Sequence, residues 1–244
     1  MTDLSAYRDK IAKLLAKAER TDNEHEAEAF TAKAEALMLQ MGIERAELQA
    51  AGTVKAEGVI ERKMDWGTIY APTWGSFLYT LSFAWGDLTI LQSRHGKNSV
   101  TSYVIGHESD VEGFLTLITS LHLQATTAMR RFRKEHANER SYRTIHENFV
   151  MDRSFLAGFA SEAASQLRRM RHEAVETAST GAALVLASKQ DAVDTWVGEH
   201  YPVLRKSRGR SQQSSSLGRA AGRQAGANAD LGSKRVGGGH KALS

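Results

Sequence analysis

The stretch Val100–Phe132, VTSYVIGHESDVEGFLTLITSLHLQATTAMRRF, decides the fold class of this chain. Residues 100–105 are rich in β-branched and aromatic side chains and predict a strand. From Val111 to Phe132, apolar side chains recur every three or four residues, which predicts one long helix with a buried face. Ser109 and Glu112 have the spacing of a capping box and mark the expected helix start.

The segments before this stretch complete a small sheet. Residues 60–66 alternate apolar and charged side chains, as a half-buried strand does. Residues 74–85 have helical spacing, and Gly86 ends them. Residues 88–91 are again β-rich, and the loop Arg94–Asn98, which contains a glycine, separates them from the next strand, so we expect a hairpin.

The segments after it are mainly helical. Residues 137–144 form a polar connection, and residues 149–170 predict a second long helix with Gly158 at a close contact. The apolar run Ala182–Leu186 predicts a strand of the buried type, followed by a helix that starts at Ser188 and ends before Pro202.

The N-terminus predicts an antiparallel helical hairpin. Residues 4–18 and 27–41 each place apolar side chains on one helical face, and lysines line the other side of the first helix. Thr21 and Glu24 have capping-box spacing in the turn, and Gly42 ends the second helix. A short third helix follows over residues 43–50.

The C-terminal region is basic and rich in Gly, Ser and Ala. Gly218, Gly222 and Gly226 recur every four residues among alanines. This spacing favours a Gly/Ala helix that packs closely on a neighbour, although glycine at this density costs about 1 kcal/mol per residue in a helix and equally fits a disordered segment. We favour a partly helical, basic arm.

Together these elements predict an α+β protein: an N-terminal helical hairpin, then a small, mostly antiparallel sheet packed with long helices. We expect a hairpin domain over residues 1–52, an α+β domain over 53–203 and a basic tail over 204–244.

The charges are unevenly distributed along the chain. The net charge is −5 over residues 1–120, +5 over 121–172, −4 over 173–200 and +8 over 201–244, which gives +4 for the whole chain. Such polarity favours a polyanionic partner. The absence of cysteine suits a reducing cytoplasm, and neither a signal peptide nor a membrane span is expected.

Several chemistries lack their residues. The nine histidines are scattered, so neither a metal site nor a cofactor is expected, and the glycine patterns of phosphate-binding loops and serine hydrolases are missing. The densest polar cluster is His107, Glu108 and Asp110 at the strand-to-helix turn. It is either an acid–base or ligand cluster, or a helix cap beside a surface histidine.

Nucleic acid is the strongest functional hypothesis. Phosphate contacts are expected from basic side chains in two helical blocks and in the tail. The four tryptophans could stack on bases, but their spacing fits the core better. The candidate phosphate-binding residues are Arg130, Arg131, Arg133, Lys134, Arg168, Arg169, Arg171, Arg205, Lys206, Arg208, Arg210, Arg219 and Arg223.

The N-terminal hairpin resembles the family known as domain of unknown function 2786. The resemblance lies in KIAKLLAKAE (10–19), EAEA (26–29), KAEALM (33–38) and MGI (41–43), and the later VIGHESDV (104–111) and SFLAGF (154–159) resemble the region that often follows it. The resemblance implies an actinobacterial, phage or mobile-element setting and assigns no catalytic residue.

The sequence therefore favours a nucleic-acid-associated accessory protein, encoded by a phage or mobile element, that binds DNA or RNA in the cytoplasm. Two other interpretations remain open. One is an enzyme of unassigned reaction with its site around His107, Glu108 and Asp110, and the other is an interaction module that presents the N-terminal hairpin to a protein partner.

Overall fold

The computed structural model describes residues 4–21, 26, 30, 33, 34, 37, 42, 45, 46, 49–52, 57–176, 180–205 and 213–231. Its centre is an antiparallel sheet with strand order β1-β3-β2. The α+β prediction is confirmed. The elements of the sheet and its neighbours are β1 (Val59–Trp66), α3 (Ala71–Trp85), β2 (Leu88–Arg94), β3 (Val100–His107) and α4 (Glu108–Glu135).

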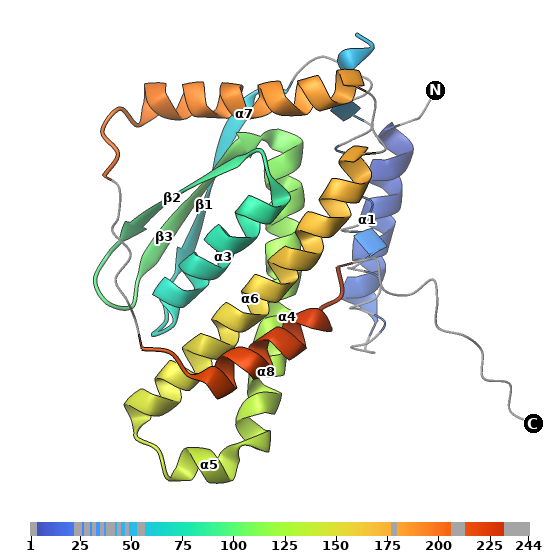
Figure 1. Ribbon diagram of the computed structural model, residues 1–244. Helices are drawn as coiled ribbons and strands as arrows, with labels where there is room; N and C mark the ends of the chain where they lie inside the picture. Colours follow the sequence, from blue (N-terminus) through green and yellow to red (C-terminus); the bar gives the residue numbers. More distant parts are fainter. Residues whose placement is uncertain are drawn as a thin grey trace, which may run out of the picture.

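Helices cover both faces of the sheet (Figure 1). On one face Val104 of β3 packs into the main core with α3 and α4. On the other face Ile105 of β3 contacts Val193 and Val197 of α7 (Thr180–His200). Adjacent strand residues point to opposite faces, so β3 joins both cores and is buried along nearly its whole length.

The predicted hairpin between β2 and β3 is confirmed. Gly96 in its loop has φ +86, a conformation in which glycine is unstrained. Leu88 pairs with Gly106 and Arg94 with Val100, while β1 pairs with the other edge of β3, from Val59 opposite His107.

The two long helices, α4 and α6 (Ile145–Glu176), are antiparallel and joined through the short helix α5 (Ala137–Ser141). The polar connection predicted over residues 137–144 therefore contains one helical segment. Three tryptophans lie in or against the main core: Trp74 and Trp85 are buried, and Trp66 stacks on Trp74.

The prediction of a strand over Ala182–Leu186 is wrong. These residues lie inside α7, which begins eight residues before the expected helix start at Ser188. A short apolar run has the same composition in a buried strand and in a helix, and Ala and Leu favour the helix. Leu184 is also 68% exposed, whereas a buried strand would enclose it.

The capping box predicted at Ser109 is also wrong. The N-cap position of α4 is His107, without a side-chain cap bond, and Ser109 lies within the first turn. A distant carboxylate takes the capping role: Glu57 Oε2 accepts hydrogen bonds from the Ser109 amide (3.1 Å) and hydroxyl (2.6 Å). A negative side chain there also complements the helix dipole.

The glycine repeat forms helix α8 (Ser216–Ala227), which packs parallel along α6. The prediction of a helix in close contact with a neighbour is confirmed for this part of the tail. Ala229 and Leu231 beyond it belong to the main core. Residues 213–231 are thus part of the folded body.

At the N-terminus, α1 (Leu4–Arg20) confirms the first helix of the predicted hairpin. The second helix is described only at isolated helical positions, and its capping residue Glu24 lies outside the described residues. No helix in the described part of the chain is long and apolar enough to cross a membrane.

Candidate nucleic-acid interface

Two of the predicted phosphate-binding arginines are bound to carboxylates of the protein itself. Arg133 of α4 donates to Asp152 of α6 at 2.9 Å. Arg171 at the other end of α6 donates to Asp87 at 2.6 Å, after the turn at Gly86. Gly86 has φ +83, and a Cβ there would collide with the Arg171 guanidinium. This arginine therefore packs directly against the backbone of the turn. Neither guanidinium is a free phosphate contact.

Asp152 is the centre of a buried polar cluster. It is 2% exposed and accepts hydrogen bonds from Tyr70, Arg133 and Arg140 at 2.8–3.2 Å. Burial, followed by the negative charge of Asp152, raises the pKa of Tyr70 to about 12. The phenol therefore stays neutral and keeps its proton for the carboxylate, and the cluster ties α3, α4, α5 and α6 together.

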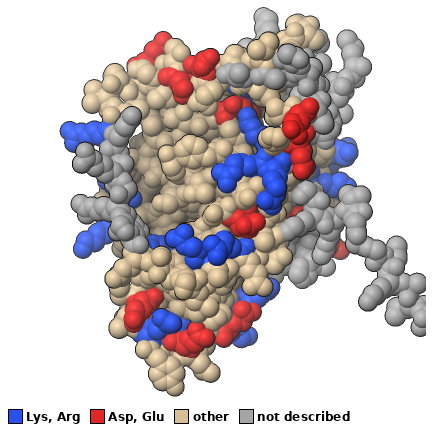
Figure 2. Space-filling model, viewed as in Figure 1, with Lys and Arg blue, Asp and Glu red and all other residues tan. Residues whose placement is uncertain are grey.

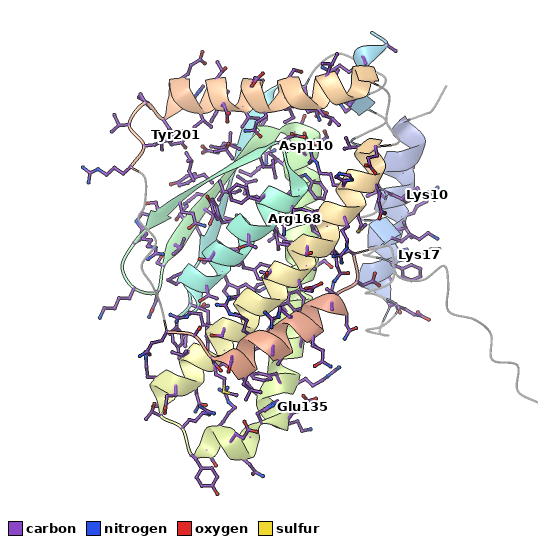
Figure 3. The ribbon with its side chains drawn as sticks, in the orientation of Figure 1. Lys10, Lys17, Asp110, Glu135, Arg168 and Tyr201 are labelled. Carbon is purple, nitrogen blue, oxygen red and sulfur yellow. The ribbon has the colours of Figure 1, made fainter. Side chains whose placement is uncertain are left out.

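The other helical candidates are exposed. Arg130, Arg131 and Lys134 lie at the α5 end of α4, among the carboxylates Glu135 and Glu139 on the chain. Arg168 and Arg169 lie near the opposite end of the long-helix pair (Figure 3). The antiparallel packing of α4 and α6 thus separates the two blocks, and they do not form one patch.

Helix α8 brings the tail arginines to the same side of the molecule as Arg168. Arg219 and Arg223 are exposed on α8. Figure 2 shows Lys and Arg side chains over α8 and over the C-terminal half of α6, beside a hollow above α3. Arg205 is exposed after α7, whereas Lys206, Arg208 and Arg210 lie outside the described residues.

The hollow is a cavity of about 650 Å³ between α3, α6, the β2–β3 loop and the start of α8. Three of its cationic side chains were missed by the sequence prediction: Arg94, Lys97 and Arg153. Arg94 ends β2, Lys97 stands in the hairpin loop and Arg153 stands on a helix, so no local pattern joins them. Among the predicted residues that the structure describes, only Arg219 lines this cavity.

The predicted cluster at His107 connects the start of α4 to neighbouring segments. His107 is 6% exposed, and its Nδ1–H donates to the Glu57 carbonyl oxygen at 2.9 Å. Asp110 accepts from the buried Lys189 of α7 at 2.8 Å, while Glu108 is exposed. His107 and Asp110 contact different partners, and none of the three side chains lines the cavity. This geometry favours a structural role over an acid–base site.

Glu57 strengthens these contacts at the start of α4. Burial opposes its ionisation, but hydrogen bonds from Ser109 and the charges of Arg45 and Lys189 outweigh it and lower the pKa of the Glu57 carboxyl. Arg45 pairs with this carboxylate at 3.1 Å. In the described residues, no group of three or more His, Asp or Glu side chains is placed to hold a metal ion.

The family comparison concerns the N-terminal segment. Residues 6–45 match the model of a family described as "Protein of unknown function (DUF2786)", which confirms the resemblance of this segment. The match ends at Arg45, the residue that pairs with Glu57 next to the start of α4. No curated protein and no solved structure matches the chain at a significant level.

Proposed function

We propose that this chain is a nucleic-acid-associated accessory protein that acts by binding, through the exposed arginines of α6 and α8. The phage or mobile-element setting rests on the family resemblance alone. The observation that carries the proposal is the set Arg168, Arg169, Arg219 and Arg223. All four are exposed, and no carboxylate of the described residues forms an ion pair with any of them.

The guanidinium groups of this set suit phosphate. Unpaired guanidinium groups keep their full charge and bidentate geometry for a phosphate. Helix α3, which packs against α6, also has exposed aromatic side chains: Phe83 is 65% and Tyr79 is 47% exposed. Cations beside exposed aromatic rings are the features that single-stranded nucleic acid uses, because its bases stack while its phosphates pair.

The test is binding of the full chain to labelled single- and double-stranded DNA and RNA over a range of salt. The Arg168→Glu/Arg223→Glu variant should lose at least about tenfold in affinity and reduce the slope of log K against log salt by about 2. Lys13→Glu/Arg143→Glu is the control, because it changes the net charge equally at exposed positions elsewhere. Equal losses in both variants, or no binding of the wild type at low salt, would refute the proposal.

A further inference from the structure

The cavity beside α3 has the size of a small-molecule site. Its volume of about 650 Å³ lies within the range of about 300–1,000 Å³ that is usual for ligand pockets. Side chains from α3, α6, the β2–β3 loop and the residues before α8 form its wall. These segments are separated in the sequence and come together around this cavity (Figures 1 and 2).

The charges on its wall are all of one sign. Arg94, Lys97, Arg153 and Arg219 line the cavity, and among the described residues no aspartate or glutamate does. In the described residues none of the four forms an ion pair, although Arg153 donates to the Gln213 carbonyl oxygen. Four cations without a countercharge around one concave surface attract an anion, because the low-dielectric walls concentrate their field.

Two helices also begin at this cavity. Pro72 and Thr73 come from the first turn of α3, and Ser214 immediately precedes the N-cap of α8. Neither helix has an acidic side chain in its first turn. The positive ends of both helix dipoles therefore add to the field of the four cations and are not offset locally.

The rest of the wall combines polar side chains of Ser, Thr, Asn and Gln with apolar and aromatic side chains. Ile69 and Phe77 come from the α3 side, and Phe149 and Ala157 from α6. The Arg153 guanidinium lies 5.9 Å from the centre of the Phe149 ring, which places a cation where the apolar and the charged parts of the wall meet. A fitting ligand has a compact anionic group and a flat apolar part.

We propose that this cavity binds a phosphorylated nucleoside, either as a free nucleotide or as the phosphorylated end of a nucleic-acid strand. The phosphate pairs with the cations, and the base lies against the apolar wall. This inference deepens the proposed function, since it adds a recognition site for one nucleotide beside a surface for the strand. Arg94 at the end of β2 and Lys97 in the following loop are both exposed, so their side chains can approach the phosphate.

The experiment compares thymidylate 8-mers that carry a 5′-phosphate or a 5′-hydroxyl, with thymidine monophosphate, thymidine and inorganic phosphate as competitors. The wild type should bind the 5′-phosphorylated 8-mer more tightly than the 5′-hydroxyl 8-mer, or thymidine monophosphate should displace the strand whereas thymidine does not. Displacement by the monophosphate identifies a free nucleotide as ligand. A preference for the phosphorylated strand without such displacement identifies the strand end.

Two cavity variants separate charge from shape. Arg94→Ser/Lys97→Ser removes two exposed cations, and Ala157→Leu narrows the cavity from an exposed helix position without changing charge. Each should weaken binding of the phosphate-bearing ligand about tenfold or more. Lys13→Ser/Arg143→Ser is the charge-matched control and should bind like the wild type.

The cavity proposal is wrong if the two 8-mers bind equally and the monophosphate does not compete, or if both cavity variants bind like the wild type. The two proposals fail separately. Salt-dependent binding of long strands that is lost in Arg168→Glu/Arg223→Glu but not in the cavity variants supports the surface alone. Monophosphate binding without strand binding supports the cavity alone.

Discussion

Asp152 illustrates how charges are used inside this protein at the scale of single residues. A carboxylate that is 2% exposed requires partners for its charge, and Tyr70, Arg133 and Arg140 provide them. Two arginines that look like nucleic-acid contacts in the sequence, Arg133 and Arg171, are instead held by carboxylates from distant segments. Residue type alone does not distinguish a structural arginine from a functional one.

Replacing Asp152 by Ala should lower the free energy of unfolding by about 3–5 kcal/mol, because two guanidinium groups lose the charge that balances them. Urea unfolding followed by circular dichroism measures this loss. Asp191→Ala, at an exposed position of α7, is the control and should change stability by less than about 0.5 kcal/mol. A loss below about 1 kcal/mol for Asp152→Ala would mean that the cluster is not a stabilising centre.

The lowered pKa of Glu57 predicts a dependence of stability on pH. A carboxyl whose pKa is lower in the folded than in the unfolded state stabilises the fold fully above its unfolded pKa. That contribution is lost as pH falls through the lower folded pKa, so stability should decrease between about pH 5 and pH 3. Glu57→Gln should flatten this part of the profile, and an unchanged slope would contradict the assignment.

At the scale of elements, the contact of α8 with α6 depends on the absence of side chains. A Cβ at Gly218, Gly222 or Gly226 would meet the carbonyl oxygen of Met151, Phe155 or Phe159 respectively. Gly158 of α6 has the same relation to Arg219 of α8. The two backbones approach closely, which gives contact area to a helix with few large side chains.

Gly222→Ala should therefore destabilise the protein by about 1–3 kcal/mol, since the clash is with backbone and cannot relax by a rotamer change. Gly198→Ala is the matched control. That glycine lies in the last turn of α7 with open space where a Cβ would stand, so alanine should stabilise by up to about 1 kcal/mol through helix propensity. Thermal unfolding of both variants tests the prediction, and equal effects of the two substitutions would contradict it.

At the scale of the whole molecule, the basic C-terminal region contributes to the fold. Residues 213–231 belong to the folded body, with Gln124 of α4 bonded to the backbone of Asp230 and Gln166 of α6 bonded to that of Gly226. Deletion of everything after residue 203 would thus uncover the α8-facing side of α6. Such a deletion would lower the stability of the fold and remove positive charge at the same time.

A chain ended after residue 231 should keep the unfolding free energy of the full chain within about 0.5 kcal/mol, whereas one ended after residue 203 should lose several kcal/mol, because it uncovers the buried α6 face and removes Ala229 and Leu231 from the core. The deletion of residues 232–244 also removes Lys234, Arg235 and Lys241. Denaturant unfolding compares the two chains. A full loss of stability on removal of residues 232–244 would show that the body extends further than α8 and Leu231.

The sequence by itself determined most of the elements, because a strand or helix repeats its burial pattern every two or about 3.6 residues and the repeat is visible locally. Val111–Phe132, the β2–β3 hairpin and the glycine spacing of α8 were predicted on this basis. The run Ala182–Leu186 was not, since five apolar residues are too few to distinguish the two periods. The resemblance of residues 6–45 to a family was equally readable from local spacing.

Only the tertiary structure decided which polar groups act together. Glu57 meets Ser109 across 52 positions of the chain, and Tyr70 meets Asp152 across 82. Arg94, Lys97, Arg153 and Arg219 likewise share one cavity although they come from three segments. An ion pair or an anion site depends on the distance between charges in space, because their interaction weakens as that distance grows. No periodicity along the chain records which charges lie close together.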